Sequence, residues 1–175
     1  MRATDLDEAP RKGELPPGLA SRLAREKCEA ARAAEGGEGG FLLAADTVVA
    51  VGRRVLPKAE EEGEARRCLE LMSGRAHRVY TAIALSCPAG RLRQRLVETR
   101  VKMKRLSDPE IAAYLASGEW RGKAGGFPAP GRAGPCVVCL AGASGGGVGP
   151  PRSGAAALLE GAGYPVRAGW GDSAA

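Results

Sequence analysis

The amino-acid sequence predicts a mixed α/β domain whose sheet is not purely parallel. Segments with helical periodicity alternate with shorter apolar segments of strand length. Two strand-like segments, residues 75–86 and 91–104, are separated only by the turn sequence "CPAG", which is typical of an antiparallel hairpin. Apolar residues make up 44% of the 175-residue chain, which is enough for the core of one domain.

The first helix should begin at Pro17, after a polar and irregular segment over residues 1–16. Proline fits the first turn of a helix, and the Ala, Leu, Arg and Glu residues that follow are good helix formers. The sequence "GGEGG" should end this helix after about Glu35.

The next segment, "FLLAADTVVAV" at residues 41–51, predicts a strand that is buried on both faces. It is apolar except for Asp46 and Thr47. A turn at residues 52–54 should follow, and then a second helix over about residues 59–72. The apolar stripe of this helix consists of Ala65, Cys68, Leu69 and Met72.

The second strand of the hairpin carries the excess of positive charge. Residues 91–105 hold seven basic residues and one acid, an excess equal to the formal net charge of +6. The basic residues alternate with other residues, so we expect a strand with one solvated face rather than a nucleic-acid surface. The alternation changes phase between Val97 and Thr99, which predicts a bulge or break there.

The rest of the chain is expected to contain two short helices and one strand. A helix over residues 108–117 should start with a capping box, formed by Ser107 and the acid three residues later. After a glycine-rich loop, a strand is expected around residues 136–141. Residues 142–154 are rich in Gly and Pro and have the composition of a linker, and a last helix should cover about residues 155–161.

Composition narrows the class of protein. With no signal peptide and no apolar run long enough to cross a membrane, the sequence predicts a cytoplasmic protein. The odd number of cysteines, five, indicates free thiols. Cys136 and Cys139 have the spacing of a zinc or redox pair, but on a strand they would point to opposite faces. His77 is the only histidine, so we expect a structural role for it.

Asp46 is the first of three residues that break the local pattern. An ionised carboxylate within an apolar strand loses hydration that the protein must replace. A buried Asp that caps a nearby backbone group is the alternative explanation, and we favour a functional role.

Lys27 and Lys58 are the other two. Lys27 lies near the middle of the apolar arc of the first helix, where a lysine must extend to solvent or reach an anion. Lys58 precedes the second helix, so its ammonium and the free N–H groups of that helix could bind phosphate together. A solvated surface lysine is the alternative for each. The glycines of "RGKAGG" around Lys123 could also approach a phosphate, but they lack the P-loop pattern.

Together these features suggest a metal–phosphate site. Carboxylates hold Mg²⁺ or Mn²⁺, and lysines neutralise phosphate oxygens. A carboxylate close to the metal can also deprotonate water for attack on phosphorus, and Asp46 fits either role.

The sequence resembles the Maf family of nucleoside triphosphate pyrophosphatases, once called septum formation proteins. The matching segments are "DLDEAPRKGELPPGLASRLAREKCEAA", "LLAADTVVAVGRRVLPKAEEEGEARRCLELMSGRAHRVYTAIAL", "VETRVKMKRLSDPEIAAYLASGEWRGKAGG" and "ALLEGAGYPVRAGW". The match covers residues 4–126 and resumes near residue 155. The resemblance implies one domain over residues 1–175, with a mixed curved sheet, flanking helices and a cleft between two lobes, as in the inosine triphosphate pyrophosphatases.

The resemblance also implies a reaction. Family members cleave nucleoside triphosphates between the α and β phosphates with a divalent metal, and pyrimidine or modified nucleotides are the candidate substrates here. Asp46 is implied as the catalytic base or a metal-associated carboxylate, and Glu8 of "DLDE" as a second acid at the metal. Lys27 and Lys58 are implied as phosphate ligands. Thr47 matches a position that helps to set base specificity.

Departures from the family pattern leave alternatives open. The family's Ser-x-Ser-Pro-Arg-Arg loop, which grips the triphosphate, has no counterpart, so we expect a chain truncated at its N-terminus relative to the family. Pro130 replaces a family glutamine, and residues 142–154 diverge. One alternative is a catalytically impaired protein with the Maf fold that still binds nucleotides. Another is a basic nucleic-acid-binding module that uses residues 91–105. A homodimer is an open alternative to a monomer.

Overall fold

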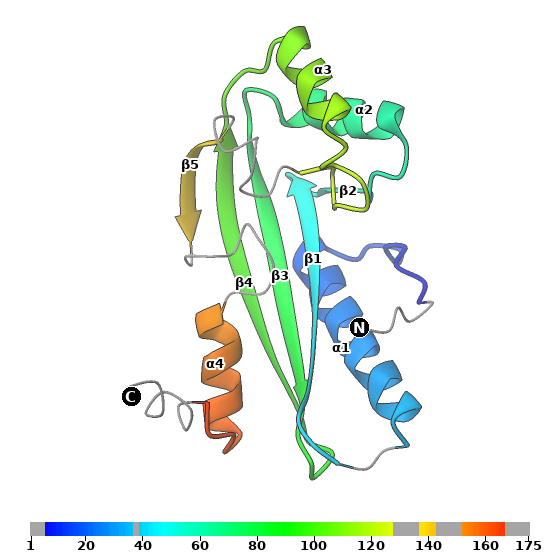
Figure 1. Ribbon diagram of the computed structural model, residues 1–175, viewed down its shortest axis with the longest axis vertical. Coiled ribbons are helices and arrows are strands. Elements are labelled where there is room, and N and C mark those ends of the chain that lie inside the picture. Colours follow the sequence, from blue (N-terminus) through cyan, green and yellow to red (C-terminus); the bar gives the residue numbers. More distant parts are fainter. Residues whose placement is uncertain (1–5, 37–38, 128–136, 143–151, 167–175) are drawn as a thin grey trace, which may run out of the picture.

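The computed structural model describes residues 6–36, 39–127, 137–142 and 152–166 (Figure 1). The elements in chain order are α1 (Pro16–Ala34), β1 (Leu42–Val51), β2 (Arg54–Leu56), α2 (Glu62–Met72), β3 (Ala76–Ser86), β4 (Leu92–Met103), α3 (Asp108–Ala116), β5 (Val137–Gly142) and α4 (Arg152–Gly161). The strands form one sheet in the order β2-β1-β3-β4-β5. Every pairing within it is antiparallel in the described part of the chain.

The α/β class predicted from the sequence is confirmed, and the element boundaries agree closely. The largest differences are at two helix starts, because α2 begins at Glu62 and α4 at Arg152. The short strand β2 was not predicted: residues 54–56 turn back along the end of β1 instead of only closing a turn. At the start of α3, the Ser107 N–H donates to Glu110 Oε2 at 3.0 Å, as the capping box requires.

Long strand pairings without interruption define the two faces of the sheet. β1 pairs with β3 from Leu42↔Ser86 to Ala50↔Arg78. β3 pairs with β4 from Ala76↔Lys102 to Ser86↔Leu92. Since side chains alternate along a strand, even-numbered residues of β1 and β3 share one face and odd-numbered residues share the other.

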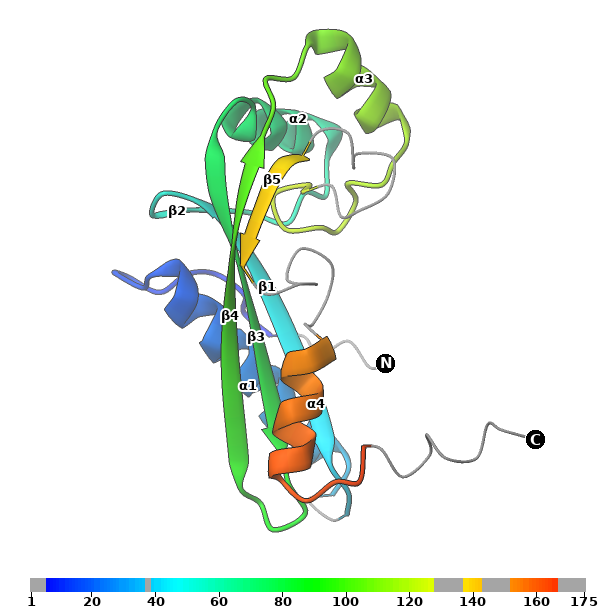
Figure 2. The same cartoon turned by 90° about the vertical axis from the view of Figure 1, so that its left-hand side faces the viewer.

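The two faces are covered by different helices, at different ends of the sheet. The even-numbered face carries α1, and the core cluster there consists of Leu19, Ala20, Leu23, Ala24, Cys28, Val48, Ala50, Tyr80, Ala82 and Ala84. On the opposite face, Val49, Val79 and Val101 pack in one cluster with apolar residues of α2 and α3. Figure 2 shows α1 and α4 on opposite sides of the sheet, with α2 and α3 at its upper end.

The bulge predicted between Val97 and Thr99 is wrong, because β4 keeps its register with β3 throughout. The phase change in the basic residues has another cause. Arg100 and Lys102 are exposed on the even-numbered face, beyond the part that α1 covers, whereas Arg93 and Arg95 lie on the odd-numbered face, beyond the part that α2 and α3 cover. The odd-numbered face of β4 is thus buried from Val97 onward but not before it, so only the even-numbered face is open to charged residues after Val97, while the backbone stays regular.

Several expectations concern residues that are only partly described. Cys28, Cys68 and Cys87 are buried free thiols, as expected. Pro130 and Cys136 lie outside the described residues, as does most of the Gly/Pro-rich segment 142–154. None of the described helices combines the length and the apolar character needed to cross a membrane.

His77, at the start of β3, is buried in the structure. Only 1% of it is exposed, and its ring meets Phe127 edge-on with centroids 4.9 Å apart. Neither ring nitrogen has a hydrogen-bond partner among the described residues. Burial lowers the pKa of His77 to about 4, from an ordinary value of 6.5.

This depressed pKa predicts a loss of stability in mild acid. Below pH 6.5 the unfolded chain binds a proton that folded His77 refuses, so the free energy of unfolding falls as the pH falls toward 4. We expect a decrease of about 1.5 kcal/mol between pH 6.5 and 5, measured by urea unfolding. His77→Leu should be much less sensitive over this interval. An equal decrease in the variant would contradict the assignment.

A candidate site of two carboxylates and two lysines

Asp46 lies in β1 on the face that α1 covers. Its neighbours on this face of β1 are Ala44 and Val48, which pack with the core cluster under α1. The side chain is almost entirely buried, with 7% of the residue exposed. It is not capping a neighbouring backbone group: its Oδ1 accepts a hydrogen bond from Lys27 Nζ at 2.5 Å. Asp46 is therefore held by a charged side chain from another element.

Lys27 reaches this carboxylate from α1. Its side chain is only 21% exposed, so most of its length is covered before the ammonium reaches the carboxylate. Its ammonium also lies 2.7 Å from Glu8 Oε1. The sequence left two possibilities for Lys27, extension to solvent or contact with an anion. The structure shows contact with two anions, Asp46 and Glu8.

Glu8 and Lys58 complete the cluster. Glu8 belongs to the irregular segment that precedes α1, and Lys58 follows β2. The Lys58 ammonium forms an ion pair with Glu8 Oε2, so Glu8 bridges the two lysines. Four side chains from four separate segments thus form one continuous set of ion pairs, which we call the Asp46–Glu8 cluster (Glu8, Lys27, Asp46 and Lys58).

The two carboxylates differ in electrostatic environment. Burial raises the pKa of Asp46, and this effect exceeds the opposing hydrogen bond from Lys27. For Glu8, partial burial acts in the same direction, but Lys27 and Lys58 together hold its pKa below the usual value. Burial would lower the pKa of Lys27, yet its contacts with Asp46 and Glu8 raise it overall. Glu8 is therefore the firmly ionised acid, and Asp46 is the stronger proton acceptor.

Thr47 is not part of the cluster. As the next residue along β1, it points to the opposite face of the sheet. There its Oγ1 lies 3.1 Å from Thr81 Oγ1 on β3. The role in base specificity implied for Thr47 stays a prediction, and it would have to act from the other side of the strand.

The glycine-rich loop around Lys123 supports the segment that carries Lys58. The Ala59 N–H donates to the Lys123 carbonyl at 3.1 Å, and the Gly125 N–H donates to the Pro57 carbonyl at 2.7 Å. Lys58 and Ala124 form an isolated antiparallel bridge. The sequence suggested that these glycines approach a phosphate, and the structure shows that their backbone holds the residues on either side of Lys58.

The oxygen atoms of the cluster suit a hard divalent cation. Glu8 and Asp46 both approach the same ammonium group, so their oxygens already converge on one positive charge. Mg²⁺ is commonly bound by one or two carboxylates, with water and substrate phosphates as its other ligands. Among the described residues no group of three or more His, Cys, Asp or Glu side chains could hold a metal alone. The residues fit a cation that is shared with a phosphate ligand.

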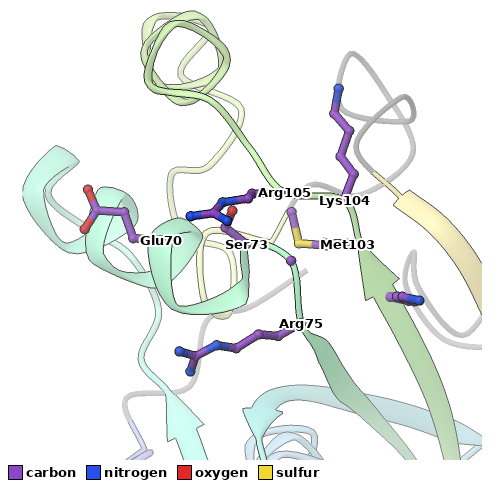
Figure 3. A pocket seen from close by; sticks show the side chains of 8 residues that line it. Glu70, Ser73, Arg75, Met103, Lys104 and Arg105 are labelled. Carbon is purple, nitrogen blue, oxygen red and sulfur yellow. The ribbon is translucent and has the colours of Figure 1, made fainter.

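A surface hollow lies elsewhere, near the C-terminal end of α2 (Figure 3). Its lining includes Arg75, Lys102 and Arg105. None of the described residues that line it belongs to the Asp46–Glu8 cluster. Arg75 and Arg105 extend in the same direction, toward α2, whereas Lys104 points away from them. Part of the basic segment 91–105 therefore lines this hollow, away from the candidate site.

Residue reasoning alone identified three members of the cluster and missed Glu8. Asp46, Lys27 and Lys58 each broke a periodic pattern, whereas Glu8 lies in an irregular segment where no pattern exists to be broken. Only the resemblance to a family indicated it.

Comparisons with known proteins agree on one family. The Maf family model, described as "Maf-like protein", matches residues 1–162. A dTTP/UTP pyrophosphatase of Rhodopseudomonas palustris (strain HaA2) is 56% identical over 174 residues, 97% of this chain and 84% of the relative. One of Nitrobacter winogradskyi is 56% identical over 177 residues, 99% of this chain and 86% of the relative. One of Maricaulis maris (strain MCS10) is 58% identical over 172 residues, 98% of this chain and 81% of the relative.

The glycine loop that supports Lys58 gives a stability prediction. Gly125 has φ +64°, and a Cβ there would lie 2.9 Å from Leu56 Cδ1 and 3.1 Å from Leu56 Cβ. Gly122, in the same loop, has φ +66° with no atom within 4 Å of its Cβ position. We expect Gly122→Ala to lower the free energy of unfolding by about 1 kcal/mol and Gly125→Ala by roughly 2–3 kcal/mol. Equal losses in denaturant unfolding would show that the contact with Leu56 is unimportant.

Proposed function

Because the chain belongs to the Maf family, we propose that it is a nucleoside triphosphate pyrophosphatase that acts on dTTP and UTP. The activity class is the one that the sequence predicted. Relatives named dTTP/UTP pyrophosphatase align with nearly the whole chain, and more than half of the aligned residues are identical. This similarity supports the activity class and the two pyrimidine substrates. The products would be the nucleoside monophosphate and pyrophosphate.

The Asp46–Glu8 cluster is the observation that carries this proposal. A triphosphate brings several negative charges, and Lys27 and Lys58 can donate to its oxygens from two directions. Glu8 binds both ammonium groups in the folded chain, which keeps the two lysines within reach of one ligand. Phosphate recognition is therefore assigned to the two lysines.

Asp46 has the properties of the general base. It is buried, and its pKa lies above the usual value, which increases its affinity for a proton taken from water. Water attacks phosphorus, the bridging P–O bond breaks, and the water proton passes to the carboxylate. Glu8 and Asp46 would hold a Mg²⁺ or Mn²⁺ ion, which supplies charge stabilisation at the phosphate oxygens when it is bound.

A panel of nucleoside triphosphates tests the activity and its substrates. With Mg²⁺ or Mn²⁺ present, the chain should release pyrophosphate from dTTP and UTP faster than from ATP or GTP, and a chelator should stop the release. Nucleotide binding without hydrolysis would favour the impaired-enzyme alternative. Tight, steeply salt-dependent binding of DNA without hydrolysis would favour the nucleic-acid-binding alternative.

Replacement of Asp46 tests the mechanism. Asp46→Asn keeps the size of the side chain but removes its charge and its capacity to accept a proton, so we expect kcat to fall by about 10²–10⁴-fold. Glu29→Gln is a matched control, because it removes one negative charge from an exposed ion pair with Arg25. It should leave kcat unchanged. A folded Asp46→Asn variant with normal kcat would exclude Asp46 as the base.

A further inference from the structure

The segment that carries Glu8 needs an anchor that its own backbone does not supply. Residues 6–15 contain no helix or strand. The backbone hydrogen bond found there, from Glu14 N–H to the Arg11 carbonyl at 2.9 Å, closes a single turn after Glu8. A carboxylate on such a segment would sample many positions unless another part of the chain held it.

Arg22 of α1 holds this segment at two points. Its guanidinium binds Glu14 with both arms, from Nε to Oε1 at 2.8 Å and from Nη2 to Oε2 at 2.9 Å. Nη2 also donates to the carbonyl of Ala9, the residue after Glu8, at 2.9 Å. Nη1 donates to Glu26 Oε2 at 3.0 Å, which fixes the guanidinium relative to its own helix.

These contacts are stronger than ordinary surface ion pairs. The side chains of Arg22 and Glu14 are only 12% and 14% exposed, so water screens the pair weakly. Two-armed binding also fixes the direction of both groups. The Arg22 guanidinium holds the pKa of Glu14 at about 2, so the pair stays charged across the working range of pH.

We propose that Arg22 is a positioning residue for Glu8, and this rests on the assignment of the Asp46–Glu8 cluster as the active site. Arg22 and Lys27 lie on the same rigid helix, which fixes the distance between the anchor at Ala9 and the ammonium that Glu8 must reach. Arg22 thereby sets where the Glu8 carboxylate lies between Lys27 and Lys58. A lysine could not replace it, because one ammonium cannot present the planar fork that Glu14 binds.

A double-mutant cycle tests whether Arg22 acts through Glu8. Arg22→Ala should lower kcat/KM for dTTP by about 10–100-fold, the usual effect of losing a residue that orients a ligand-binding carboxylate. In a Glu8→Gln background, the same change should have less than about a twofold further effect. Fully additive losses would overturn the proposal.

A second measurement does not depend on catalysis. In the wild-type chain, Arg22 Nη2 binds the Ala9 carbonyl at 2.9 Å and holds the backbone beside Glu8 against α1. Backbone order parameters of residues 7–10, from ¹⁵N relaxation, should fall below about 0.6 in Arg22→Ala, while those of β1 and β3 stay near the rigid value of about 0.85. Unchanged order parameters of residues 7–10 in the folded variant would overturn the proposal. If the wild type released no pyrophosphate, the proposed function would fail, while this relaxation measurement would still decide the role of Arg22.

Two further variants make this measurement specific. Arg25→Ala is the matched control, since Arg25 also pairs with an acid, but its partner at 2.8 Å is Glu29 on the same helix and not the segment 6–15. It should leave the order parameters of residues 7–10 unchanged. Glu14→Gln removes the two-armed partner of Arg22 and keeps the guanidinium, so it serves if Arg22→Ala fails to fold. We expect the same direction of change from it, with a smaller size.

Discussion

The contact between the Lys27 ammonium and the buried Asp46 carboxylate constrains how the rest of this structure is arranged. Removing both charges from water is costly unless they meet at close range, and here they meet at 2.5 Å. The contact requires α1 to lie on the even-numbered face of β1. The small residues Ala20 and Ala24 on α1, with Ala50 and Ala82 on the strands, allow that approach.

Because β3 and β4 are long, different helices cover the two faces of the sheet, and they do so at opposite ends. Each strand is too long for one helix layer to bury, so α1 covers one face at one end, and α2 and α3 cover the other face at the other end. The predicted bulge failed for this reason: residue alternation reports which side chains are solvated, but not which face the protein covers. A strand face that is covered over only part of its length and a bulge give the same change of phase in the sequence.

The sequence predicted the elements and most of the cluster because both depend on local periodicity. Asp46, Lys27 and Lys58 stood out against periodic surroundings, and strand periodicity alone would also have placed Thr47 on the opposite face from Asp46. Glu8 and Arg22 were beyond such reasoning. Glu8 lies in an irregular segment, and Arg22 lies outside the apolar arc of its helix, where it resembles a solvated residue. Their roles depend on contacts between segments that are separated along the sequence, which no single periodicity encodes.

The four charges of the cluster are held by supports of unequal stiffness. The ladder with β3 fixes Asp46, and the first helix fixes Lys27. The segment of Glu8 depends on side-chain contacts, those of Arg22 and the Arg11–Glu26 ion pair, and Lys58 depends on backbone hydrogen bonds between its neighbours and the glycine loop. Segments held by a few hydrogen bonds open locally at lower free energy than strands of the core. The cluster can therefore lose Glu8 or Lys58 while the sheet stays folded, so the accuracy of this site is set by residues outside it, and not by the stability of the fold as a whole.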